Sequence, residues 1–278
     1  MAEKLFLNGY QLSSDLFQDR AFHYGDGVFE TIAVSHGALC LWNYHVERLL
    51  NGCETLGLDK FDPIKLQEEA QKLANGYSRA VLKIIISSGG GARGYSRPYQ
   101  NKSNRYMSIY PWPEADIYNN LEGLRVQWCK ICLSKQPFLA GVKHLNRLEQ
   151  VLARRELRDE IDEGLMCDTD QFVIEGTSSN IFLKKNKKFF TPSLESCGVD
   201  GAVRRFFIDF LKKNGFDLII KKINKEQIFD ADNLFLTNSL LGIRQAKSID
   251  EYDYDFSIES NHFLKEAQQN CFTLTGSF

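Results

Sequence analysis

The sequence lacks three features that would indicate a membrane or nucleic-acid partner. No apolar stretch approaches the ~18 residues needed to cross a bilayer, and the best run, 81–86, is interrupted by Lys83. The chain also has no large excess of either charge, since it contains 34 Lys and Arg residues and 36 Asp and Glu residues and has a net charge of −2. Anionic membranes and nucleic acids both select a basic surface. The N-terminus also shows no export signal, so we expect a cytoplasmic enzyme with neither partner.

Cysteine is present but is too scattered for a disulfide framework. The seven cysteines are an odd number spread from Cys40 to Cys271, which fits reduced thiols buried as small apolar side chains. Cys129 and Cys132 have the spacing of a redox or zinc motif, but no second Cys or His pair follows at metal-ligand spacing. We therefore expect no disulfide and no metal site.

Strand and turn patterns alternate through the first third of the chain. Between residues 46 and 56 apolar side chains recur with a period near 3.6, which predicts a helix that Asn43 caps. Asp62 as a cap and Pro63 in the first turn predict a second helix, which ends before Gly76. The expected strands are 4–12 as a hairpin about Asn8-Gly9, 28–34, 38–42, 80–87 and 105–110.

A break in the pattern separates two halves. Pro111-Trp112-Pro113 and the polar residues 114–120 interrupt any regular element. A chain of 278 residues is long enough for two modest domains. We predict a mixed α/β (α+β) fold with an N-terminal domain of 1–113, a linker of 114–123 and a larger domain of 124–278, with a cleft between them. After the linker, the expected elements are strand 124–133, helix 146–159, strands 164–168, 171–184 and 189–190, helix 203–213, strand 218–223, a helical turn at 225–229, strand 233–237 and helix 260–272.

Lys143 is a candidate nucleophile. It lies in a segment of small and apolar residues just before a predicted helix. An apolar setting and a helix N-terminus both disfavour the ammonium form, which lowers the pKa of a lysine toward that of a reactive amine. A neutral amine can form a Schiff base with an aldehyde. The alternative is an ordinary solvated lysine, and this segment alone leaves both open.

A second segment offers a carboxylate and an anion cradle. Glu175 ends an apolar run and is followed by a Gly-Thr-Ser-Ser-Asn turn. The hydroxyls of Ser178 and Ser179, the amide of Asn180 and the N–H groups of the turn are suited to hold a phosphate. Stretches 198–204 and 236–239 share this character. Taken singly, each stretch is equally well explained as a polar β-turn.

Together these features have one economical explanation, which is pyridoxal 5'-phosphate. That cofactor needs an amine for its aldehyde, an anion cradle for its phosphate and a carboxylate facing its ring nitrogen. Lys143, Glu175 and the three cradle-like stretches meet these needs.

The histidines at 23, 36, 45 and 262 have no neighbours in sequence that a general base or a metal site would require.

The chain also resembles a known family, the fold-type IV pyridoxal-phosphate enzymes, which include branched-chain aminotransferases, D-amino-acid aminotransferases and aminodeoxychorismate lyases. The resemblance covers nearly the whole chain, through the motifs at 7–9, 19–21, 24–31, 45–49, 139–152 and Asn238-Ser239. It implies the two-domain architecture of the D-amino-acid aminotransferases, pyridoxal 5'-phosphate as cofactor and a small-molecule substrate. It also implies a homodimer with the active site near the subunit interface.

The resemblance further implies roles for individual residues. Lys143 matches the lysine that holds the cofactor, Glu175 the residue that pairs with the pyridine nitrogen, and Arg48 the arginine that binds the phosphate. The remaining cofactor-binding positions are Ser178, Ser179, Asn180, Gly201, Ala202, Val203, Asn238 and Ser239. The substrate-side positions are Tyr24, Phe29, Arg93 and Tyr95, with Arg97 as a rival to Arg93 for a substrate carboxylate, because glycine-rich loops align poorly.

Within that family, segments 139–152 and 91–96 look closest to the aminodeoxychorismate lyases. The lyases carry threonine where Thr31 stands, whereas branched-chain aminotransferases usually carry glycine and D-amino-acid enzymes an aliphatic residue. The Thr31 hydroxyl is therefore a catalytic candidate for relaying a proton to the departing group. The alternative is that its β-branched side chain only favours a strand. Glu30, by contrast, is more typical of the aminotransferases.

The lyase resemblance implies elimination of pyruvate from aminodeoxychorismate to give 4-aminobenzoate for folate biosynthesis. The alternative within the family is an aminotransferase that acts on D-amino acids or branched-chain amino acids. A non-catalytic phosphate- or nucleotide-binding module built on Gly89-Gly90-Gly91 is a third hypothesis. No Lys-Ser or Lys-Thr pair follows those glycines, which disfavours a P-loop.

Overall fold

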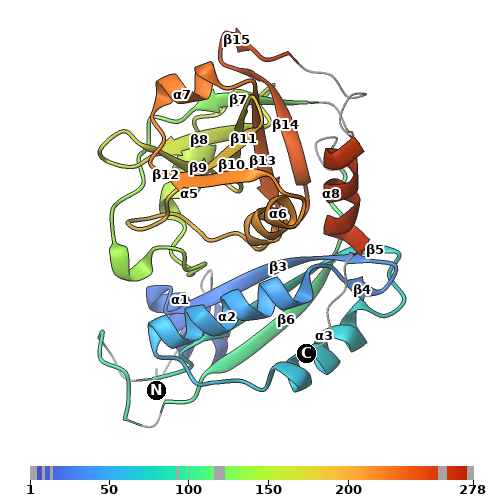
Figure 1. The fold of residues 1–278 in the computed structure, drawn as a ribbon. Coiled ribbons are helices and arrows are strands. Elements are labelled where there is room, and N and C mark those ends of the chain that lie inside the picture. The colour runs from blue at the N-terminus through green and yellow to red at the C-terminus, as the bar shows by residue number, and fades with distance from the viewer. Residues whose placement is uncertain are drawn as a thin grey trace.

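The computed structural model describes residues 5–7, 10–12, 15–91, 94–99, 101–115, 123–255 and 262–273. Figure 1 shows two parts stacked one on the other, each built around a β-sheet. Helices α2 (Trp42–Leu56) and α6 (Ala202–Lys213) contact each other where the two parts meet. The mixed α/β architecture predicted from the sequence is confirmed, while the exact domain borders at 113 and 124 stay a prediction.

The smaller sheet holds four antiparallel strands in the order β4 (Ala38–Leu39), β3 (Gly27–Ser35), β5 (Arg79–Ser87) and β6 (Asn104–Pro111). Helices α2 and α3 (Pro63–Ala74) pack against it. On α2 the side chains of Val46, Leu49 and Cys53 are buried in the shared core, so the predicted 3.6 period is the face that the helix buries. Asp62 caps α3, since its carboxylate accepts from the Ile64 N–H at 2.9 Å.

Short elements precede this sheet. Strands β1 (Leu5–Leu7) and β2 (Tyr10–Leu12) pair antiparallel, as the hairpin pattern predicted, but Asn8 and Gly9 lie outside the described residues. The 3-10 turn η1 (Asp15–Gln18) and helix α1 (Arg20–Tyr24) then lead into β3.

The larger sheet runs in the order β12 (Asp217–Lys221), β11 (Lys188–Pro192), β10 (Asn180–Lys185), β13 (Asn233–Asn238), β14 (Gly242–Ile249), β7 (Leu124–Trp128), β8 (Glu163–Cys167) and β9 (Val173–Gly176), with β15 (Tyr252–Asp253) paired to β14. The two ends of this order approach each other, because the Val173 N–H donates to the Ile223 carbonyl at 2.8 Å. The sheet therefore curls into a nearly closed barrel.

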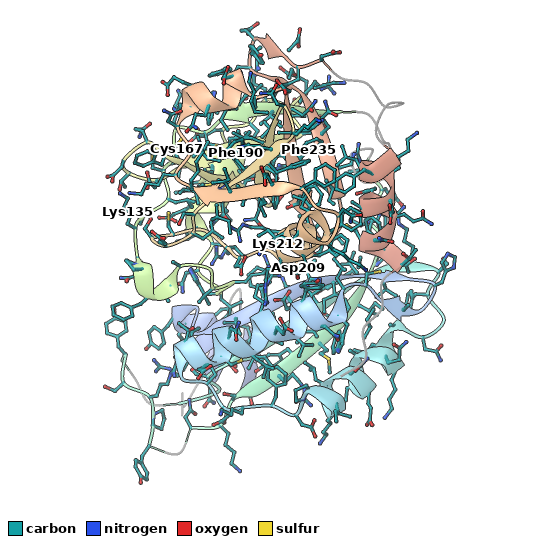
Figure 2. All side chains as sticks on the ribbon, viewed as in Figure 1. Lys135, Cys167, Phe190, Asp209, Lys212 and Phe235 are labelled. Carbon is teal, nitrogen blue, oxygen red and sulfur yellow. The ribbon has the colours of Figure 1, made fainter. Side chains whose placement is uncertain are left out.

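Alternate side chains of the larger sheet enter two different cores. Ile181 and Leu183 pack with Ile228 of α7 (Lys225–Asp230), whereas Phe182 and Phe235 pack under α6 and α8 (His262–Thr273). Successive side chains of a strand point to opposite faces, so one strand supplies both cores. Figure 2 shows these densely packed side chains, with Phe235 labelled among them.

Several predicted element bounds were wrong, and the strand predicted for 171–184 is two strands, β9 and β10, separated by the turn at 177–179. Helix α2 begins at Trp42, and its cap position is Leu41, which makes no side-chain cap, so Asn43 does not cap it. Burial of Leu41 and Trp42 in the core decides where the helix begins. The strand predicted for 124–133 ends at Trp128, because the Glu156 carboxylate accepts the N–H groups of Lys130 and Ile131 and draws them out of the sheet. The helix predicted for 146–159 is shorter than expected and is α5 (Leu148–Arg154).

Strand β14 is the longest of the described elements that the sequence analysis missed. It lies between β13 and β7 near the middle of the larger sheet and is flanked on both edges. Its burial does not alternate, and Arg244 is among its buried residues. A strand with a buried arginine does not show the apolar alternation that predicts a strand.

The cysteine side chains lie mostly inside the fold. All seven cysteines are free and six are buried, which confirms that they pack as small apolar side chains. Within the described ranges, no helix is both long and apolar enough to span a bilayer. The same residues contain no group of three or more His, Cys, Asp or Glu side chains arranged to hold a metal.

Candidate active site

A pocket of about 480 Å³ opens between the two sheets. Residues of β3 and α2 line one side, and residues that follow the linker line the other. Most of the predicted site residues meet there, namely Phe29, Thr31, Arg48, Lys143, Glu175, Ser178, Ser179, Asn180, Gly201, Ala202, Val203, Asn238 and Ser239. The tertiary fold thus brings together motifs that lie far apart in the sequence.

Lys143 is held by strand-like pairing against β3. The Phe29 N–H donates to the Lys143 carbonyl at 3.0 Å, and the Leu145 N–H donates to the Gly27 carbonyl at 2.9 Å. The Lys143 Nζ lies 4.3 Å from the centroid of the Phe29 ring. Burial and, after it, the charge of Arg48 lower the pKa of Lys143 to about 7, against the opposing effect of Glu30. A large fraction of this amine is therefore neutral and nucleophilic near pH 7.

Glu175 stands at the end of β9 and shares the pocket with Lys143. Its Oε2 accepts the Val199 N–H at 2.7 Å. Burial raises the pKa of Glu175 to about 6, although the Val199 N–H and the charge of Arg147 oppose the rise. A carboxyl group with a pKa near neutrality can share a proton with a basic ring nitrogen.

The far end of the pocket is built to attract an anion. The twelve-residue helix α6 begins there, after Gly201, and its first N–H groups have no partner within the helix. A Cβ on Gly201 would lie 2.0 Å from Asn180 Oδ1, so only glycine allows this approach. Arg48 and Ser239 line the same end. The Thr237 hydroxyl is buried in the pocket wall without a hydrogen-bond partner among the described residues.

A buried carboxylate supports Arg48 from behind. Glu30 is 1% exposed and accepts from Arg48 Nε at 2.7 Å and from Arg48 Nη2 at 2.6 Å. Its Oε2 also lies 2.6 Å from His45 Nδ1. Burial alone would raise the pKa of Glu30, but the charge of Arg48 and the hydrogen bonds from Arg48 and His45 outweigh it and lower the pKa to about 2. The expectation that His45 lacks partners was wrong, because its partner lies on β3, 15 positions away in sequence.

The hydroxyls of the Thr-Ser-Ser turn point at a second buried carboxylate. Ser178 Oγ donates to Glu163 at 2.7 Å and Ser179 Oγ at 3.0 Å, and Thr177 Oγ1 is also bonded to this carboxylate. A hydroxyl has one hydrogen to donate. Ser178 and Ser179 line the pocket, but the structure does not support them as donors to a phosphate. Glu163 was not identified from the sequence, because its partners follow it by 14 to 16 residues.

Two of the predicted substrate-side residues lie outside this pocket. Tyr24 and Tyr95 line a separate hollow with Asp26, and their rings meet edge to face at 5.6 Å. Tyr95 is 89% exposed. Arg93 lies outside the described residues, so the structure does not place its side chain.

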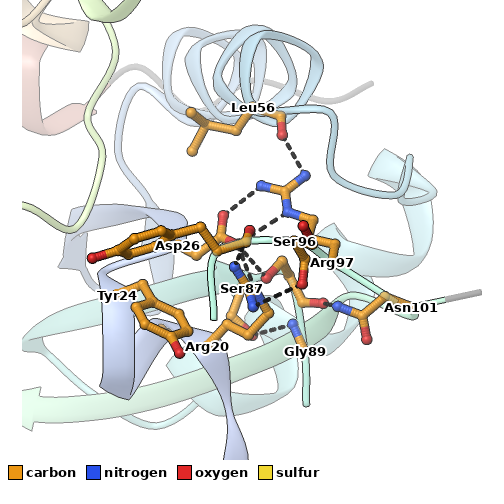
Figure 3. Close-up of polar contacts among 12 residues, drawn as sticks. Arg20, Tyr24, Asp26, Leu56, Ser87, Gly89, Ser96, Arg97 and Asn101 are labelled. Carbon is orange, nitrogen blue, oxygen red and sulfur yellow. Dashed lines mark hydrogen bonds and ion pairs between the residues drawn. The ribbon is translucent and has the colours of Figure 1, made fainter. Parts of the chain in front are cut away.

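Arg97 was a rival for binding a substrate carboxylate, and the structure argues against that role. Its Nε donates to Asp26 at 3.0 Å, its Nη2 donates to the other oxygen of Asp26, and its Nη1 donates to the Leu56 carbonyl (Figure 3). Nη1 also donates to the Gly57 carbonyl at 3.0 Å. Arg20 also donates to Asp26, and to the carbonyls of Gly94 and Tyr95. Both guanidinium groups are therefore occupied in holding the loop.

Helix α5 contributes a wall that the sequence analysis did not assign. Arg147, Gln150 and Arg154 line the pocket at helical spacing. Arg147 donates to the carbonyls of His144 at 2.8 Å and Val142 at 3.2 Å, which tethers the segment that carries Lys143. The spacing of three, then four residues was visible in the sequence and is typical of one helix face.

Comparison with known proteins places these features in context. The family model described as amino-transferase class IV matches residues 27–249. An aminodeoxychorismate lyase of Vibrio harveyi is 34% identical over 91% of this chain and 94% of its own. A crystal structure of 4-amino-4-deoxychorismate lyase from Pseudomonas aeruginosa has a TM-score of 0.84 and 35% identity, covering 94% of this chain and 95% of that chain. A putative branched-chain-amino-acid aminotransferase of Methanocaldococcus jannaschii is 27% identical over 89% of this chain and 88% of its own.

The buried carboxylate behind Arg48 leads to a stability prediction. Glu30→Gln leaves Arg48 as an uncompensated buried charge, so we expect the free energy of unfolding to fall by about 3–5 kcal/mol, measured by urea unfolding. Because the folded pKa lies below the ordinary value of 4.5, the stabilisation is present above that pH and is lost as the pH falls toward 2. Glu47→Gln is the control, since Glu47 is an exposed partner of Arg205 and should cost under ~1 kcal/mol. Equal losses in the two variants would contradict the prediction.

Proposed function

The chain belongs to the class IV aminotransferase family, and from that membership we propose that it is a 4-amino-4-deoxychorismate lyase, which converts its substrate into 4-aminobenzoate and pyruvate. The observation that carries the proposal is the sequence identity to proteins of this name, which extends over 91% and 94% of the chain. The relatives described above that bear this name share 34% and 35% of aligned residues with it. The archaeal aminotransferase shares 27%.

The pocket suits pyridoxal 5'-phosphate, the cofactor of this family. The unpartnered Thr237 hydroxyl, the Arg48 guanidinium and the start of α6 offer hydrogen-bond donors at one end, where they would hold the phosphate. Lys143 would hold the aldehyde carbon and Glu175 would face the ring nitrogen. When bound, the cofactor supplies an electron sink for negative charge on the substrate carbon that carries the amine.

Lys143 acts as the base in this proposal. With the substrate bound, the free Nζ would take the proton from the carbon that carries the amine. With a pKa of about 7, it accepts that proton and gives it up again near neutral pH. Glu175, with a raised pKa of about 6, holds a proton at the ring nitrogen while charge develops.

Thr31 lies on β3 and lines the pocket beside Phe29. We propose that its hydroxyl delivers a proton to the enolpyruvyl group, which leaves from the neighbouring ring carbon as pyruvate. The ring that remains becomes aromatic as this bond breaks, which favours elimination over return of the proton. Elimination and amino transfer would both begin with removal of this proton by Lys143, and they differ only in the fate of the negative charge left on the carbon.

Glu30 does not favour the aminotransferase alternative. Although the residue is more typical of that branch, its side chain is 1% exposed and both its oxygens accept from Arg48. It therefore supports the phosphate end of the pocket and faces no substrate.

A direct assay tests the activity. Incubation with aminodeoxychorismate should release 4-aminobenzoate, measured by its fluorescence after chromatography, while a D-amino or branched-chain amino acid with 2-oxoglutarate should yield little glutamate. Lys143→Ala should lower lyase turnover by at least about 10³-fold, because both the tether and the base are lost. Glutamate without 4-aminobenzoate would replace the lyase by the aminotransferase. Full turnover by Lys143→Ala would remove Lys143 from its role.

The lowered pKa of Lys143 predicts how cofactor capture depends on pH. Only the neutral amine attacks an aldehyde, so the rate of pyridoxal 5'-phosphate capture by cofactor-free protein should rise about tenfold per pH unit below about 7. Above that pH it should level off. Stopped-flow absorbance near the visible band of the bound cofactor measures the rate. A rate that keeps rising to pH 10 would contradict the burial of Lys143.

We also propose a homodimer, as the family resemblance implies, and apolar exposure near the pocket supports it. Phe138 is 87% exposed and Leu148 of α5 is 75% exposed, next to pocket-lining residues of the same helix. Exposed apolar groups of this size on one face are typical of a protein interface. A cytoplasmic location and a substrate-binding role of Arg93 likewise stay predictions.

Light scattering tests the dimer. The protein should have twice the chain mass of 31.9 kDa, and the double variant Phe138→Asp with Leu148→Asp should shift toward that chain mass, because charge is expensive in an apolar interface. Ile64→Asp, on exposed α3, is the matched control and should stay dimeric. A wild-type monomer at micromolar concentration would contradict the proposal.

A further inference from the structure

His45 is a buried imidazole with a partner at each ring nitrogen. Its side chain is 1% exposed. Nδ1 lies 2.6 Å from Glu30 Oε2, and Nε2 lies 3.4 Å from Ser239 Oγ. Ser239 lines the pocket at the end that attracts an anion. His45 therefore connects the carboxylate behind Arg48 with a hydroxyl inside the pocket.

Protonation of His45 at Nε2 decides whether the Ser239 hydroxyl can donate a hydrogen bond into the pocket. Glu30 is ionised and only accepts hydrogen bonds, so Nδ1 carries a hydrogen in either state of the ring. In a neutral ring, Nε2 is an acceptor and takes the single hydrogen of the Ser239 hydroxyl. Ser239 then presents lone pairs to the pocket, which repel a phosphate. In a charged ring, Nε2 donates to Ser239 Oγ, and the hydroxyl hydrogen is free to point at an anion.

The charges around His45 favour the neutral ring until an anion arrives. Burial lowers the pKa of His45, Glu30 of β3 opposes this, and Arg48 of the same helix and Lys143 of the facing segment add to the lowering. Arg48 is already matched by Glu30 at 2.6 Å. A phosphate dianion at Ser239 would bring negative charge next to Nε2 and would reverse that balance, because an opposite charge within ~4–6 Å favours the charged form.

We propose that His45 is a positioning residue that takes up one proton when a phosphate group enters the pocket, and that the resulting imidazolium turns Ser239 from an acceptor into a donor to that phosphate. The proton comes from solvent and adds to Nε2, and no covalent bond to a heavy atom changes. The proposal rests on the proposed function, since the phosphate is that of the cofactor. It predicts that phosphate binding strengthens as pH falls and weakens as pH rises past the pKa of His45 in the loaded protein.

The test uses pyridoxamine 5'-phosphate, which carries the phosphate but no aldehyde, so Lys143 stays a free amine. Long-range ¹H–¹⁵N NMR of the full-length protein labelled at histidine reports the protonation of each ring. The chain has five histidines, and the spectrum of His45→Gln identifies the His45 signal. At pH 7 we expect this signal to change from the neutral Nδ1–H form to the imidazolium when pyridoxamine 5'-phosphate binds, and to stay neutral with pyridoxamine.

His144 is the control within the same spectrum. It accepts the Asn146 N–H at 3.2 Å and does not line the pocket, so its ring should stay neutral throughout. A His45 ring that remains neutral in the loaded protein would overturn the inference alone. Failure of the protein to bind pyridoxamine 5'-phosphate at all would overturn both the inference and the proposed function.

A calorimetric measurement supports the spectroscopic one. A glutamine at position 45 can donate to Glu30 and accept from Ser239, so His45→Gln imitates the neutral ring at every pH. Binding measured in buffers of different ionisation enthalpy should show that wild type takes up about one proton more than the variant. The affinity of the wild-type protein for pyridoxamine 5'-phosphate should be about tenfold higher than that of the variant at pH 6. The two affinities should converge at high pH. Equal proton uptake by the two proteins would overturn the inference.

Discussion

Two backbone hydrogen bonds between β3 and the segment 143–145 are the constraint on which the site depends. They run from Phe29 N–H to Lys143 and from Leu145 N–H to Gly27, and they attach the segment that carries the lysine to the smaller sheet. Gly27 is required at this point, because a Cβ there would lie 2.5 Å from the Ile86 carbonyl. With this pairing in place, Lys143 can face only the pocket, where Glu175, Arg48 and the start of α6 surround it.

Burial affects the ionisable groups of the site differently because their partners differ. Glu30 and Glu175 are both nearly inaccessible, yet the pKa of Glu30 is lowered to about 2 and that of Glu175 is raised to about 6. Glu30 accepts from a guanidinium and an imidazole, whereas Glu175 has one strong backbone donor. Glu30 therefore remains a fixed negative charge, and Glu175 can gain or lose a proton near neutral pH. Both are needed if one end of the pocket is to bind an anion and the other to stabilise a cationic ring.

Much of the site was predictable because its chemistry resides in local motifs. Lys143 and Glu175 each lie in a short segment whose residue types suggest a reactive amine and a carboxylate, while the role of Arg48 followed from the family resemblance. The failures share one cause, which is that the deciding partner is distant in sequence. Arg97 is satisfied by Asp26, 71 positions away, the serine hydroxyls by Glu163, and His45 by Glu30. A hydrogen bond to a distant residue changes what a side chain can do without leaving any trace in its own motif.

Most of the strands and helices, the cofactor chemistry and the family were determined by the sequence itself, since apolar periodicity and motif composition act over a few neighbouring residues. Only the tertiary structure decided which donors remain available to a ligand. Each hydroxyl or guanidinium has a limited number of hydrogens, and the fold commits some of them to Glu163, Asp26 and Glu30. What is left for the pocket depends on contacts between residues that only three-dimensional packing brings together.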